Sequence, residues 1–94
     1  TLDPDFMEMV GLRQFEKILV ANLENGERFE TYAIAGQRGS KVCCLNGATA
    51  HKGAVGDRVI VFSFCMLDES EIATHQPRIA VFGDDNVVIR RSPI

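Results

Sequence analysis

Short runs of alternating or apolar residues, separated by turn residues, make up most of this chain. Residues 17–23 are apolar and favourable for β-structure, and residues 28–34 alternate between polar and apolar positions. Between them, Asn25 and Gly26 form a dipeptide typical of a hairpin turn, because both residues tolerate positive φ. The pattern therefore predicts two antiparallel strands joined by a turn.

Further short strands are expected along the rest of the chain. Residues 41–45 predict one, and a second Asn-Gly turn follows at residues 46–47. Residues 58–66 are the most apolar segment and predict a central strand buried on both faces. Residues 78–82 and 87–90 predict a C-terminal hairpin. Six or so short strands with little helix indicate a small barrel or sandwich.

Two short helical segments interrupt this β pattern. Asp3 can cap a helix that starts at Pro4, and Gly11 can end it in the left-handed conformation. A polar helical turn is expected to begin at residues 68–71 and to stop before Pro77. Both segments are brief, so we expect them to pack on the strands rather than to form a layer.

The composition is that of one globular domain spanning residues 1–94, with 46% apolar and 24% charged residues. A core of this size is modest, so support from a partner subunit is expected. The net charge is −3 and the basic residues are scattered, which argues against a nucleic-acid partner. The longest apolar run, residues 59–67, is about half the length of a membrane span, so no membrane segment is expected. The N-terminal residues also lack the pattern of a secretory signal.

The cysteines and histidines show no metal-binding pattern. Cys43, Cys44 and Cys65 have neither zinc-like spacing nor an even count, which indicates reduced thiols and a cytoplasmic location. His51 and His75 lack carboxylate or cysteine partners at ligand spacing, so no metal site is expected.

Two segments carry candidate chemistry. In the first, alternation puts Arg28, Glu30 and Tyr32 on one strand face and Thr31 on the other. A guanidinium can bind a carboxylate bidentately, and a phenol can give or take a proton. In the second, residues 42–51, small side chains can let a ligand approach the backbone N–H groups. Taken alone, the first segment is better explained as an ordinary hairpin and the second as an ordinary turn, and neither segment identifies a reaction.

Taken together, the motifs are more specific. They are Asn25-Gly26-Glu27-Arg28-Phe29, Thr31-Tyr32-Ala33-Ile34, Arg38-Gly39-Ser40, Leu45-Asn46-Gly47-Ala48, Ala50-His51, Val55-Gly56-Asp57 and Val59-Ile60. In this combination, the chain resembles the bacterial aspartate 1-decarboxylase family, from Thr1 to about Phe82.

The resemblance implies that the chain is the large fragment of a precursor that cuts itself at a Gly-Ser bond. The serine, two positions before Thr1, would become a pyruvoyl cofactor, which fits a chain that begins with Thr1. The small fragment would be a separate chain. The implied fold is a six-stranded double-psi β-barrel with short helices, assembled as a homotetramer with sites between subunits.

The implied reaction converts L-aspartate to β-alanine and CO₂, a step that feeds pantothenate and coenzyme A synthesis. By the resemblance, Tyr32 is the proton donor, and Arg28 binds the retained carboxylate of the substrate. Thr31 would assist precursor cleavage and contact the pyruvoyl group. The wall of the pocket corresponds to Asn46, Gly47, Ala48 and Thr49.

Two positions depart from the family pattern. Ala21 stands where relatives often have a bulky aromatic residue, and Thr49 stands where alanine is usual. Thr49 can add a hydrogen bond in the pocket or reshape it. Two other functions stay open at this point: a non-catalytic barrel that binds an anionic metabolite through Arg28, and a pyruvoyl decarboxylase for another acidic amino acid such as glutamate.

Overall fold

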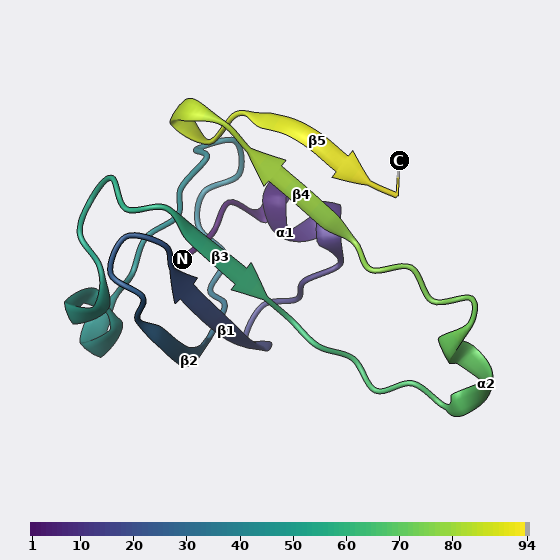
Figure 1. Ribbon diagram of the computed structural model, residues 1–94. Helices are drawn as coiled ribbons and strands as arrows, with labels where there is room; N and C mark the ends of the chain where they lie inside the picture. Colours follow the sequence, from purple (N-terminus) through teal and green to yellow (C-terminus); the bar gives the residue numbers. More distant parts are fainter. Residues whose placement is uncertain (94) are drawn as a thin grey trace.

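The strands of this chain form two separate sheets, and a long excursion between them carries a short helix away from the rest of the molecule (Figure 1). The computed structural model describes residues 1–93. One sheet has the strand order β2-β1-β3, and the other pairs β4 with β5. The elements are α1 (Pro4–Val10), β1 (Lys17–Asn22), β2 (Arg28–Tyr32), the 3₁₀ helix η1 (Gly47–Lys52), β3 (Val59–Phe62), α2 (Glu69–Ile72), β4 (Ile79–Phe82), the 3₁₀ helix η2 (Asp84–Asn86) and β5 (Val88–Ser92).

Helix α1 forms as its capping residues predict. Asp3 is the N-cap and its side chain accepts a hydrogen bond from the Asp5 N–H, while Pro4 takes the first helical position. Gly11 ends the helix with φ 71°, a left-handed conformation that glycine adopts without a steric penalty. The sequence prediction for this helix is confirmed.

The antiparallel pair β1–β2 is also confirmed, with a longer connection than the predicted turn. Lys17 pairs with Tyr32 at one end and Ala21 with Arg28 at the other. Gly26 has φ 75°, but Asn25 keeps a negative φ. Asn25 instead uses its side chain, whose Oδ1 accepts from the Glu27 N–H at 2.9 Å. The connection therefore differs from a two-residue turn in which both residues have positive φ.

The most apolar segment forms an edge strand, so the predicted central strand is wrong. Within residues 1–93, β3 pairs only with β1, which is the middle strand of the sheet. Val59 and Val61 pack against the core, whereas Ile60 is 41% exposed. The segment carries apolar residues on both faces although one face is partly exposed, and in sequence this pattern is indistinguishable from burial on both sides.

The C-terminal hairpin and the second helical turn lie where they were expected. β4 and β5 pair antiparallel, and the rings of Phe6 and Phe82, 4.5 Å apart, join α1 to β4. Helix α2 starts with a capping box between Asp68 and Glu71. It lies within the excursion between β3 and β4, where Met66 is fully exposed.

The buried core is small and joins α1 to one face of the larger sheet. Met7 and Leu12 pack with Ile18 and Val20 of β1 and with Ala33. The fold is mainly β with short helices, as predicted. The strands of residues 1–93 form two open sheets and no closed barrel, so the six-stranded double-psi barrel stays a prediction. None of the helices in this range is long and apolar enough to cross a membrane.

Candidate functional site

The first three residues form an extended segment with hydrogen-bonding neighbours on both sides. On one side it runs parallel to the chain that follows β2, with Leu2 paired to Ala35. The Leu2 N–H donates to the carbonyl of Ile34 and the Gly36 N–H donates to the carbonyl of Leu2, both at 2.8 Å. This side ties the N-terminal segment to the residues that continue from Tyr32.

On the other side the segment runs antiparallel to residues 42–44. Leu2 pairs with Cys43, and the Asp3 N–H donates to the carbonyl of Val42 at 2.9 Å. Thr1 and Cys44 exchange two backbone hydrogen bonds, of 2.8 and 2.9 Å. The N-terminal segment is therefore a central strand of a small local ladder, although its neighbours belong to no regular sheet.

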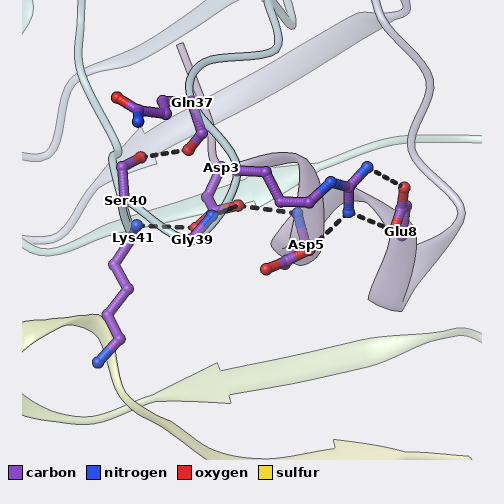
Figure 2. A network of polar contacts seen from close by, with 8 residues as sticks. Asp3, Asp5, Glu8, Gln37, Gly39, Ser40 and Lys41 are labelled. Carbon is purple, nitrogen blue, oxygen red and sulfur yellow. Dashed lines mark hydrogen bonds and ion pairs between the residues drawn. The ribbon is translucent and has the colours of Figure 1, made fainter.

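Asp3 fixes the base of this segment, as Figure 2 shows. It is 1% exposed, and its carboxylate accepts from the backbone N–H groups of Asp5, Gly39 and Lys41 at 2.9, 3.2 and 2.7 Å. Burial raises the pKa of this carboxyl, but the three N–H donors and the charge of Arg38 outweigh it and leave the pKa below its ordinary value. The ionised carboxylate thus holds the start of α1 to the loop at residues 39–41.

Arg38 strengthens the same junction from outside. Its guanidinium donates to Asp5 at 2.6 Å and to both oxygens of Glu8, at 2.7 and 2.9 Å. Hydrogen bonding to the guanidinium lowers the pKa of Glu8. Arg38 belongs to a family motif, and here its contacts are structural.

A cavity of about 340 Å³ opens beside Thr1. Apolar side chains of β1 and β3 form one wall, and the end of β2, the N-terminal segment and residues 43–49 form the others. Six of the seven predicted site residues line it: Thr31, Tyr32, Asn46, Gly47, Ala48 and Thr49.

Asn46 joins this cavity to the N-terminal segment. Its Nδ2 donates to Oγ1 of Thr1, and its Oδ1 accepts from Cys44 Sγ at 3.3 Å.

Desolvation raises the pKa of the neighbouring Cys43 thiol, which therefore stays protonated at neutral pH, although Cys43 as a whole residue is exposed.

Thr49 stabilises the turn that carries Asn46. Its Oγ1 donates to the carbonyl of Asn46 at 2.6 Å, at the start of η1. The hydroxyl expected to add a hydrogen bond to the pocket therefore bonds the pocket's own backbone. Gly47 has φ 60°, which lets the chain turn sharply after Asn46.

Tyr32 is at the cavity end of β2 and is 56% exposed. Its ring centroid lies 6.3 Å from that of Phe15. The burial of β2 alternates as predicted, with Arg28, Glu30 and Tyr32 exposed and Thr31 half-buried. A phenol at this position can exchange a proton with a molecule in the cavity.

Arg28 is the predicted site residue that the structure leaves apart. It begins β2, opposite Ala21, and is not among the residues from 1 to 93 that line the cavity. No ion pair of Arg28 occurs within the described chain.

Thr1 and Cys44 line the cavity and Asp3 anchors the N-terminal segment, and none of the three was a functional candidate from the sequence. Their roles come from pairing between residues about 40 apart, which no local pattern encodes. The family motif at residues 45–51 identified the turn at residues 46–49, but not the N-terminal segment that lies beside it. No cluster of histidine, cysteine or acidic residues suited to a metal ion occurs in the described part of the chain.

Comparison with known proteins gives a consistent set of similarities. The family model for aspartate decarboxylase matches residues 1–89. The chain is 47% identical over 92 residues to aspartate 1-decarboxylase of Caldicellulosiruptor saccharolyticus, covering 98% of this chain and 72% of that protein. It is 49% identical over 90 residues to aspartate 1-decarboxylase of Halorhodospira halophila, covering 96% and 71%. The same-named protein of Staphylococcus aureus strain Newman is 48% identical over 89 residues, covering 95% and 70%.

Proposed function

This chain belongs to the aspartate decarboxylase family, and on that premise we propose that it decarboxylates L-aspartate to β-alanine and CO₂. The observation that carries the proposal is the cavity beside Thr1, where a phenol, a hydroxyl and a side-chain amide gather around the N-terminal segment. These groups are suited to orienting a small polar substrate and to supplying a proton.

The cofactor in this proposal is a pyruvoyl group made from a serine two positions before Thr1. The residues present fit such a group. Leu2 pairs with Ala35 on one side and with Cys43 on the other. The proposed serine lies three residues before Leu2, so both pairings, if continued, bring it opposite Tyr32 and Asn46.

When present, the pyruvoyl ketone supplies an electron sink for the loss of carbon dioxide. Tyr32 Oη holds the proton that replaces the departing carboxylate. Thr31, which lies next to Tyr32 on the opposite strand face and also lines the cavity, assists precursor cleavage and contacts the cofactor.

Arg28 binds the carboxylate that the substrate keeps. A guanidinium holds a carboxylate through two parallel hydrogen bonds, which fixes its orientation. Binding the departing carboxylate equally tightly would stabilise the ground state against loss of its charge, so Arg28 is assigned to the retained group. Asn46 and the turn at Gly47, Ala48 and Thr49 form the opposite wall.

The wider assembly follows from the same proposal. Residues 1–94 form the single domain of the large fragment, and the small fragment completes a six-stranded double-psi barrel. Four copies form a homotetramer with sites between subunits, so that Arg28 of one copy can serve the cavity of another. The enzyme works in the cytoplasm, in pantothenate and coenzyme A synthesis.

Intact-mass analysis of protein made from the full-length gene, together with an assay for β-alanine, tests the proposal. We expect a short second chain, a large chain whose N-terminus carries a ketone, and inhibition by hydroxylamine or borohydride. Fully cleaved protein that releases no CO₂ from aspartate would refute it. Preferential release of CO₂ from glutamate would show that glutamate, rather than aspartate, is the substrate. An uncut chain that binds dicarboxylates would favour a non-catalytic binding protein.

A further inference from the structure

The side-chain amide of Asn46 has a defined partner at each end. Its Nδ2 faces the hydroxyl of Thr1 and its Oδ1 faces the thiol of Cys44, 3.3 Å away. A hydroxyl can donate or accept, so Thr1 alone gives the amide no preferred orientation. A thiol is a weak donor and its sulfur a weak acceptor, so an amide oxygen is the better neighbour for it.

The thiol belongs to the residue that pairs with Thr1. Cys44 and Thr1 exchange both backbone hydrogen bonds, so the Cys44 backbone is fixed relative to the N-terminal segment. Asn46 is fixed from the other direction, because Thr49 Oγ1 donates to its carbonyl at 2.6 Å. The amide lies between two anchored backbones, and the thiol of Cys44, which is closer to Asn46 Oδ1 (3.3 Å) than to the Leu45 carbonyl (3.8 Å), favours one of its two orientations.

We propose that Cys44 is a positioning residue of the decarboxylase. Its thiol keeps the amide oxygen of Asn46 turned toward itself, so that the amide N–H₂ remains available to hold Thr1. The inference rests on the proposed function, in which the reacting group lies two positions before Thr1. Losing the thiol lets the amide rotate, and a rotated amide faces Thr1 with its oxygen instead of its N–H₂, which changes the contact that holds the segment carrying the reacting group.

The test compares Cys44→Ala and Cys44→Ser in protein cleaved from the full-length precursor. A hydrogen bond of this kind is worth on the order of 1 kcal/mol, so we expect Cys44→Ala to lower kcat about fivefold. KM should change little, since the carboxylate-binding arginine is untouched. Cys44→Ser keeps a donor of similar size and should recover most of the lost kcat. Cys65→Ala, which removes an exposed cysteine outside the cavity, should behave as wild type.

A double-mutant cycle with Asn46→Ala separates positioning from general packing. If Cys44 acts through Asn46, Cys44→Ala should not lower kcat any further in a chain that already carries Asn46→Ala. Equal losses of kcat in both backgrounds would overturn the inference, as would a Cys44→Ser variant as slow as Cys44→Ala. A wild-type enzyme inactive on aspartate would instead sink the proposed function, so the two failures are distinct.

Discussion

Tyr32 and Arg28 lie on the same exposed face of β2, but only Tyr32 lines the cavity beside Thr1. Arg28 is four positions before Tyr32 on an extended strand, so about 13 Å separates their Cα atoms and Arg28 lies at the far end of the strand. If both side chains serve one reaction, we expect the guanidinium to come from a second copy of the chain.

Mixing two inactive variants tests that arrangement. Co-expressed Tyr32→Phe and Arg28→Ala subunits should form some sites with a wild-type tyrosine from one copy and a wild-type arginine from another. Random assembly predicts recovery of about a quarter of the wild-type specific activity. Each variant alone is the control, and mixed oligomers that stay as inactive as the single variants would mean that one copy supplies both residues.

Tyr32→Phe should abolish most turnover while leaving the fold and self-cleavage intact. The ring remains and only the proton donor is lost, so we expect kcat to fall by about 10²–10⁴-fold. Tyr32 is largely exposed, so the unfolding midpoint should not change measurably. Steady-state β-alanine formation and gel analysis of the cleaved chains measure both effects. A kcat near that of wild type would remove Tyr32 from the proposed role.

Arg28→Lys should mainly weaken the binding of aspartate. Lysine keeps the charge but cannot form the two parallel hydrogen bonds of a guanidinium. We expect KM to rise about tenfold or more, with a smaller change in kcat. Arg13→Lys is a matched control, because Arg13 is exposed and does not line the cavity. An unaltered KM in Arg28→Lys contradicts the assignment.

Gly36→Ala should slow both maturation and turnover, because Gly36 packs tightly against the N-terminal segment. An added Cβ would lie 2.8 Å from a methyl carbon of Thr1 and 2.8 Å from one of Val42. The segment has to shift, and the proposed reacting group shifts with it. Adding Thr1→Ser and Val42→Ala removes both methyl groups and should restore part of the rate. Failure of this combination to help would show that the clash is not the cause.

Acid should weaken the hold on the N-terminal segment through Asp3. The pKa of its carboxyl is lowered in the folded chain, so its stabilising effect is complete above the unfolded value of 3.8 and disappears as the pH falls through the lower folded value. Wild type should therefore lose stability more steeply than Asp3→Asn below about pH 4, in urea unfolding at a series of pH values. Asp84→Asn, an exposed change in η2, is the control; parallel curves for wild type and Asp3→Asn would contradict the prediction.

The local structure was predictable wherever one residue type dictates a backbone conformation. Asp3, Pro4 and Gly11 marked both ends of α1, and alternation from Arg28 to Tyr32 gave the correct faces of β2. The family motifs also identified six residues that the fold brings to one cavity. These features depend on short stretches of chain, so the sequence contains them directly.

Long-range pairing was not predictable in the same way. β3 lies at the edge because β1 is the strand that is paired on both sides. An apolar run has the same sequence pattern in an edge strand as in a central strand. The partnership of Thr1 with Cys44 and Asn46 joins residues more than 40 positions apart. Residues 41–45 were expected to form a strand, but Cys43 forms only an isolated bridge, because its partner is the N-terminal segment rather than another regular strand.

Free chain ends normally fray, since nothing holds their backbone on either side. Here the opening residues are bonded to both neighbours and anchored at the base by a buried carboxylate. Breaking the chain just ahead of them would create a new terminus without creating a loose one. A catalytic group carried at that terminus would have the rigidity of an interior residue, and self-processing would change the covalent structure while leaving the geometry nearly as it was.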